Sequence, residues 1–166
     1  KSHEFVPAAM GTAAPVVQFH PMGGMMVAFT TGKSVDTGDF PKTGVQQRIY
    51  GIWDKTSYAG ATSTIPTGLT ELLSRTLVVN SSNDLIQTRT TSIDWTTKKG
   101  WYINIPFASG MGVSNLEYAK DGSRDIGVPL IYPADSGTSC NGGSLGIYVQ
   151  ISGLTGLLNA DVFGTG

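Results

Sequence analysis

Few residues in this sequence have the types and spacing that catalysis requires, and the first candidate is Ser144. It lies in a Gly-x-Ser-x-Gly pattern, Gly142–Gly146. In many hydrolases this pattern places a nucleophilic serine on a turn between a strand and a helix, and the histidine comes later in the chain. Here both histidines, His3 and His20, precede Ser144, and a strand pattern follows it. We therefore interpret this segment as a turn.

A second arrangement has the chain order histidine, aspartate, serine that is found in one class of protease. The residues available for it are His20, then Asp36, Asp39 or Asp54, then Ser136. Triads are recognised by geometry, and a chain with many Ser and Asp residues produces this order by chance. Because His20 belongs to a His-Pro turn, we expect its ring to pack or hydrogen-bond locally.

Metal ligands are sparse. Two separated histidines and one cysteine, Cys140, cannot supply a tetrahedral zinc site, and no Asp-x-Asp-x-Asp-Gly calcium loop occurs. The nearest acidic pair, Asp36 and Asp39, is interpreted as solvated loop residues or part of an Asx turn. No glycine-rich phosphate-binding motif occurs at a strand–helix junction. The sequence therefore predicts a protein that is not an enzyme and uses no metal or cofactor.

Aromatic side chains are the remaining candidates for binding. Trp53 and Trp101 lie within predicted strands, where aromatic rings usually fill the core between sheets, so we predict that both are buried. Trp95 follows Asp94 at the end of a strand, and we expect it to be partly exposed. Together with the loop residues Asp36 and Asp39, Trp95 completes the set of candidate contact residues.

The composition favours a secreted β-protein and gives no sign of a nucleic-acid partner. A chain of 166 residues is long enough for one domain with a sizeable core. With 11 Lys and Arg against 12 Asp and Glu, it has no basic surface for nucleic acid. Charged residues make up 14%, against about 25% in an average domain. The sequence has no apolar run of about 18 residues, so no membrane-spanning segment is expected.

Alternating apolar and polar residues predict strands along most of the chain. Two apolar runs, Val16–Phe19 and Met25–Thr31, flank a Pro-x-Gly-Gly turn, which is the pattern of a β-hairpin. Residues 1–15 are interpreted as a lead-in segment, and Gly32–Gly44 as a long loop before the next strand. The further predicted strands are Gln47–Trp53, Leu77–Val79, Ile86–Asp94, Trp101–Ile105, Asp125–Tyr132 and Gly146–Ile151.

A single segment, Pro66–Arg75, has helical spacing, with Leu69, Leu72 and Leu73 on one face. A helix of two to three turns is marginal alone and must pack on the sheet. The predicted fold class is therefore all-β, with antiparallel sheets and one short helix.

Five short motifs follow one another along the chain. They are Phe29-Thr-Thr-Gly-Lys33, Tyr50-Gly-Ile-Trp-Asp54, Thr90–Trp95, Gly100-Trp-Tyr-Ile-Asn-Ile-Pro106 and Cys140-Asn-Gly-Gly143. Together they resemble the C-terminal propeller domain of the PilY/PilC family of type IV pilus biogenesis factors and tip-associated adhesins. The resemblance covers about Val16 to Gly156, although family members commonly carry another apolar strand pair before the cysteine motif. It implies that residues 16–166 are part of a modified β-propeller.

The resemblance also implies a function by binding. Such a domain would act on the bacterial surface or at the pilus tip, where it would bind minor pilins, the pilus tip complex or a host-cell surface receptor. Proteins of the family can carry a calcium loop, but no segment here matches it. Since the chain starts at Lys1 without a signal sequence, we expect a processed product or a piece of a longer protein. A carbohydrate-binding β-domain and a quinoprotein-like propeller enzyme stay open as alternatives.

Overall fold

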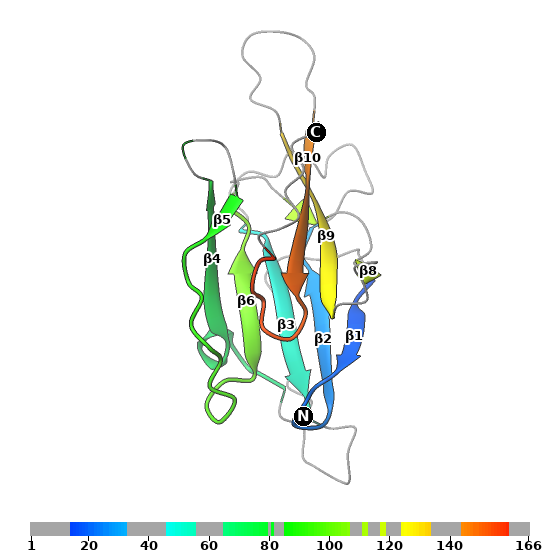
Figure 1. The fold of residues 1–166 in the computed structure, drawn as a ribbon, viewed down its shortest axis with the longest axis vertical. Coiled ribbons are helices and arrows are strands. Elements are labelled where there is room, and N and C mark those ends of the chain that lie inside the picture. The colour runs from blue at the N-terminus through cyan, green and yellow to red at the C-terminus, as the bar shows by residue number, and fades with distance from the viewer. Residues whose placement is uncertain are drawn as a thin grey trace, which may run out of the picture.

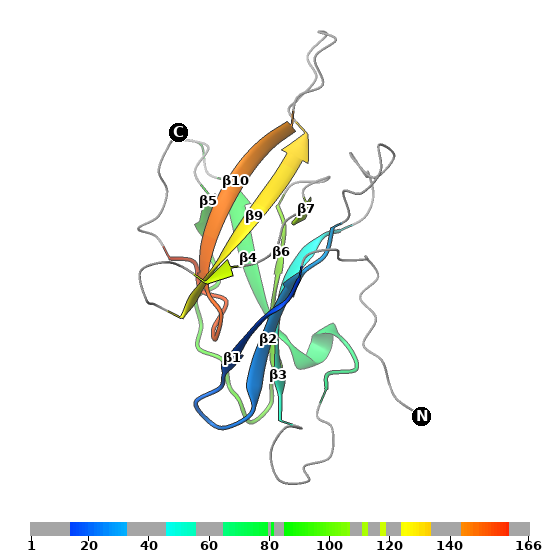
Figure 2. The same cartoon turned by 90° about the vertical axis from the view of Figure 1, so that its right-hand side faces the viewer.

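The computed structural model describes residues 14–32, 46–55, 65–79, 81, 85–106, 111–112, 117–118, 124–133 and 144–159. These residues form two β-sheets that pack against each other (Figures 1 and 2). The all-β prediction is confirmed. The predicted contact residues Asp36 and Asp39, together with Ser136, Cys140 and most of the lead-in segment, lie outside the described residues.

The larger sheet has six strands in the order β1-β2-β3-β6-β4-β5. Neighbouring strands are antiparallel except for β4 and β6, which are parallel and pair Leu73 with Trp101. The strands are β1 (Val16–Phe19), β2 (Met25–Thr30), β3 (Arg48–Asp54), β4 (Leu73–Val79), β5 (Leu85–Gln87) and β6 (Gly100–Asn104). The parallel pair makes this sheet mixed, whereas the sequence predicted antiparallel sheets.

The smaller sheet is dominated by one long antiparallel pair, β9 (Asp125–Pro133) and β10 (Ser144–Ser152), which lies in front of β2 and β3 of the larger sheet in Figure 1. Two short strands, β7 (Met111–Gly112) and β8 (Glu117–Tyr118), also pair with β9. Ser144 begins β10, so a strand follows the Gly-x-Ser-x-Gly pattern as predicted. No helix within the described ranges is long and apolar enough to cross a membrane.

The period of two along each strand sorts the side chains of the larger sheet between two faces. On β2, Met26 and Ala28 are buried against the smaller sheet, whereas Val27 and Phe29 are half-buried on the outer face. The inner residues join one core with apolar side chains of β9 and β10. The outer face carries a second, smaller cluster of Tyr50, Ile52 and Leu72.

Trp101 is the point at which the two sheets meet. It is fully buried, as predicted, and lies opposite Gly51 of β3. A Cβ atom on Gly51 would overlap the Trp101 indole, and so would a Cβ atom on Gly156, which has φ +67°. The indole Nε1 donates a hydrogen bond to the carbonyl oxygen of Leu154 at 3.1 Å. The ring therefore fixes the turn after β10 onto the larger sheet.

The predicted helix over Pro66–Arg75 is wrong for most of its length. The structure has one 3-10 turn, η2 (Leu69–Glu71), and the chain then enters β4 at Leu73. The Thr67 N–H and hydroxyl both donate to Glu71 Oε1, at 2.9 and 2.6 Å, which closes this single turn. Isolated short helices are marginal, so pairing of Leu73 with β6 determines the backbone beyond it.

The predicted strand Ile86–Asp94 is confirmed only at its start, because β5 ends at Gln87. The reason is the fully buried Arg75 of β4. Its Nη1 donates to the carbonyl oxygens of Arg89 and Thr91, at 3.2 and 2.6 Å. Those carbonyl groups are directed at a side chain, so this part of the chain does not continue the ladder.

The contact between Gly51 and Trp101 can be tested by adding one methyl group. We expect Gly51→Ala to lower the free energy of unfolding by about 1–3 kcal/mol, since the added atom overfills a packed site. The matched control is Gly146→Ala in β10, where a Cβ would meet only the Leu130 oxygen at 3.8 Å. Urea denaturation followed by circular dichroism compares them, and equal midpoints would show that the close approach is not a constraint.

Candidate functional site

Of the three predicted contact residues, Trp95 is the one that the structure describes, and it is half-buried as expected. Its ring packs against the main core and meets the rings of His20 and Trp53 edge-on, at centroid distances of 4.5 and 5.3 Å. Trp53 is buried, as predicted. Trp95 therefore has a structural role beside any role in contact.

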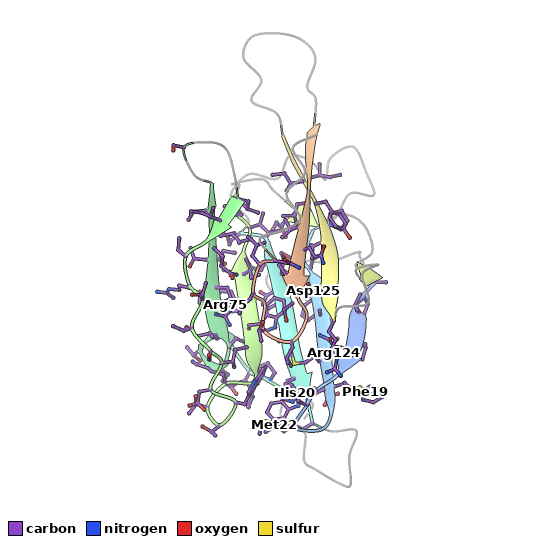
Figure 3. The ribbon with its side chains drawn as sticks, viewed as in Figure 1. Phe19, His20, Met22, Arg75, Arg124 and Asp125 are labelled. Atoms are coloured by element: carbon purple, nitrogen blue, oxygen red, sulfur yellow. The ribbon has the colours of Figure 1, made fainter. Side chains whose placement is uncertain are left out.

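His20, Trp53 and Trp95 form an aromatic cluster beneath the turn between β1 and β2. The His20 ring is stacked on Trp53 with 4.0 Å between centroids and is only 4% exposed. Figure 3 shows His20 at the same end of the molecule as Phe19 and Met22. The three rings come from the hairpin turn, the end of β3 and the turn before β6, so the cluster joins three separate segments.

Hydrogen bonds hold the turn in one shape. The Gly23 N–H donates to the His20 carbonyl oxygen, and the His20 N–H donates to that of Gly24, both at 3.0 Å. The Trp53 Nε1–H donates to the Gly23 carbonyl oxygen at 2.8 Å. The Met22 N–H donates to His20 Nδ1 at 3.1 Å. The prediction that His20 packs and hydrogen-bonds locally is confirmed.

Glycine is required at the second position of the Gly-Gly pair. Gly23 and Gly24 both have positive φ, at 90° and 76°. A Cβ on Gly24 would overlap the carbonyl oxygen of Asp54, whereas one on Gly23 would meet nothing within 4 Å. The turn is therefore pressed against the end of β3, which is also the end that carries Trp53.

Three large apolar side chains are exposed on this braced hairpin, and we call them the hairpin patch. They are Val17 (48% exposed), Phe19 (64%) and Met22 (63%). Val17 and Phe19 are two residues apart on β1 and therefore share a face of the sheet. No Asp, Glu, Lys or Arg occurs between residues 16 and 30. The patch is thus apolar and has no charge within its own hairpin.

The electrostatics of the cluster favour a neutral His20. Burial lowers the pKa of His20, and the positive charge of Lys55 lowers that pKa further. The Lys55 ammonium lies over the Trp53 ring, 3.8 Å from its centroid. His20 Nε2 is buried and has no hydrogen-bond partner. The nearby Asp94 carboxylate is bound by Thr96 and Thr97, and these hydrogen bonds lower its pKa.

The described residues assemble no catalytic or metal-binding arrangement around His20. Its Nδ1 accepts from a backbone N–H rather than from a serine or an acid. Within the described ranges, no three His, Cys, Asp or Glu side chains converge on a point where a metal ion could be held. What this arrangement can do chemically is present apolar surface in a fixed shape.

Sequence reasoning did not identify the hairpin patch. The available signal was Met22, an apolar residue inside a Pro-x-Gly-Gly turn where polar residues are usual. The exposure of Phe19 had no clear signal in the sequence, because apolar residues on both faces of Val16–Phe19 are equally typical of a strand covered on both sides.

No protein family model, no curated protein and no solved structure matches this chain.

The double role of Trp95 leads to a stability prediction. We expect Trp95→Ala to lower the free energy of unfolding by about 2 kcal/mol, less than the value for a fully buried tryptophan, because this ring is only partly buried. Phe19→Ser should change stability by no more than about 0.5 kcal/mol. Thermal and urea unfolding of both variants are the measurements. An unchanged melting temperature for Trp95→Ala would mean that the ring serves contact alone.

Proposed function

We propose that this chain is a non-enzymatic binding module and that the hairpin patch is its contact surface. The single observation that supports this most strongly is the exposure of Phe19 and Met22 on a turn that the aromatic cluster and four hydrogen bonds hold in place. Exposed apolar side chains that gather on one rigid element are a common sign of a protein interaction site. Aromatic residues and methionine are enriched in such interfaces.

The patch is suited to a partner in two physical respects. Covering the exposed parts of Phe19 and Met22 would contribute roughly 1–2 kcal/mol each from apolar area alone. The turn already has its bound shape, since His20 and Trp53 brace it from beneath. Little conformational entropy would then be lost on binding, and preorganisation of this kind raises affinity. An uncharged apolar surface fits an apolar protein surface better than a nucleic acid.

The biological setting that we propose comes from the motif resemblance. The two most specific motifs lie on neighbouring strands, β3 and β6, where Gly51 and Trp101 face each other in the ladder. A glycine and a tryptophan that must occur together to pack are a more demanding match than two independent motifs. We therefore propose part of a PilY/PilC-like propeller domain that acts on the bacterial surface or at the pilus tip. Its β-rich, curled sheet is compatible with such a propeller.

The proposed partners are minor pilins or the pilus tip complex, with a host-cell surface receptor as the further partner. Loops on a rigid sheet scaffold commonly carry recognition while the core carries stability. In this chain a tight turn that carries the hairpin patch would have the role that loops have in such proteins. In this arrangement the candidate residue Trp95 supports the contact surface through its ring contacts with His20 and Trp53.

The proposal is tested by removing the two most exposed side chains of the hairpin patch without disturbing its support. We expect Phe19→Ser/Met22→Ser to weaken binding to purified minor pilins by about tenfold to a hundredfold, which corresponds to about 1.4–2.8 kcal/mol. The matched control, Ile65→Ser/Ile86→Ser, removes two other exposed apolar side chains and should bind normally. Surface plasmon resonance gives the affinities, and melting temperatures verify that each variant is folded.

Two results would contradict the proposal. Equal affinities of the patch variant and the control would exclude the hairpin patch as the contact surface. Binding to a glycan array that depends on Trp95, in place of binding to pilins, would favour the carbohydrate-binding alternative.

A further inference from the structure

We propose that His20 makes the β1–β2 turn sensitive to acid, so that the hairpin patch keeps its shape at neutral pH and is released when His20 takes up a second proton. The release itself follows from the geometry of the turn, whereas its effect on a partner rests on the proposed function. Met22 bonds directly to the His20 ring, and Phe19 is its neighbour in sequence. A change at His20 therefore acts directly on Met22, and on Phe19 only through the backbone that joins it to His20 at the end of β1.

The hydrogen bond from Met22 determines which ring nitrogen of His20 carries hydrogen. The Met22 N–H donates to Nδ1, so Nδ1 acts as the acceptor and the neutral ring carries its hydrogen on Nε2. A second proton can be added only at Nδ1. Its hydrogen would then face the Met22 N–H, and two donors cannot share that position. Protonation therefore breaks the bond that ties Met22 to the ring.

The charged groups around His20 do not compensate for this loss. The hairpin itself contributes none. The end of β3 contributes Lys55, whose charge has the same sign as a protonated ring and lies over Trp53, and Asp54, which the strand period places on the face opposite Trp53. The turn with Trp95 contributes Asp94, whose carboxylate accepts from the Thr96 N–H, the Thr96 hydroxyl and the Thr97 hydroxyl. It also leads into Lys98 and Lys99, which have the same sign as a protonated ring and bind the Thr70 carbonyl oxygen and Glu71.

Burial of the His20 ring also disfavours its protonated form. Nε2 has no partner for its hydrogen, and the ring is almost fully enclosed. Contact of a positively charged ring with the Trp53 face would be favourable, but it would not restore the bond to Met22. Burial and Lys55 both lower the pKa of His20, so the neutral ring is favoured in the folded protein.

The sign of the pH effect follows from this lowered pKa. The unfolded chain takes up a proton at about pH 6.5, above the pH at which the folded chain does. The stabilising contribution of neutral His20 is therefore complete above about pH 6.5. It is lost as the pH falls from there toward the lower folded-state pKa.

The experiment is an NMR titration of the whole chain from pH 8 to pH 4.5. We expect the His20 ring to titrate below pH 6.5, and the Met22 amide and Trp53 Nε1–H resonances to shift with the same midpoint. The protection of the Met22 amide against hydrogen exchange, corrected for the intrinsic effect of pH, should fall at least tenfold across that midpoint. The second histidine of the chain, His3, gives a separate ring signal, identified by its loss in His3→Gln.

Two variants separate titration of His20 from general acid effects. In His20→Asn, the side-chain oxygen can accept from the N–H two residues ahead, as in an Asx turn, but it cannot take up a proton. The Met22 amide should then show no transition. In Lys55→Gln the like charge is removed, so the His20 midpoint should move to higher pH. This second variant keeps the test decisive even if His20→Asn does not fold.

Several outcomes would overturn the inference. They are a His20 midpoint at or above pH 6.5, a Met22 amide resonance that does not shift as His20 titrates, or the same transition in His20→Asn. Affinity for minor pilins measured at pH 7.5 and pH 5 distinguishes the two proposals. Binding that needs Phe19 and Met22 but is equal at both pH values would overturn acid control and leave the proposed function standing. A turn that titrates in a chain that binds no pilin would overturn the proposed function and leave the acid-sensitive turn.

Discussion

The structure depends on one close contact, the Trp101 indole lying between two glycine backbones. Gly51 belongs to β3 and Gly156 to the turn that follows β10, and neither position has room for a Cβ. The Nε1 hydrogen bond to Leu154 fixes the orientation of the ring. Because the β9–β10 hairpin ends in this turn, the ring sets the smaller sheet against the larger one. The apolar core between the sheets then packs around the indole.

The buried Arg75 links the turn that Trp101 holds in place to the segment that carries the aromatic cluster. Burial lowers the pKa of its guanidinium, which bonds to backbone carbonyl groups: Nε to Thr155, next to Gly156, and Nη1 to Arg89 and Thr91. It thereby ties the turn after β10 and the irregular segment after β5 to β4. That segment leads directly to Trp95, whose ring makes a T-shaped contact with the ring of His20. A charge in the core thus positions a residue that supports the surface hairpin.

The sequence was sufficient to predict the features that local patterns determine. The hairpin at Pro21–Gly24, the strand β3 and the burial of Trp53 and Trp101 all follow from alternation and turn residues, and the structure confirms them. The parallel pairing of β4 with β6 could not be predicted, because it joins segments that no local signal connects. The end of β5 at Gln87 depends on Arg75 being buried, which is uncommon for arginine. The exposure of Phe19 depends on what covers the outer face of β1, and a strand pattern does not specify this.

The contrast between the buried support of the β1–β2 turn and its exposed surface supports the proposal that the hairpin patch serves recognition. Its support is specific: Gly24 fits against Asp54, and Trp53 bonds to Gly23. Its surface needs no such residues, because any residue except proline at position 22 supplies the backbone N–H that bonds to His20, and a polar residue at position 19 could still pair with Met25. The backbone hydrogen bonds of the turn therefore do not depend on the side chains of Phe19 and Met22. Lys or Pro commonly protects an edge strand against unwanted pairing, but β1 contains neither. Apolar residues on a surface that the fold does not require to be apolar are consistent with the partner that we propose.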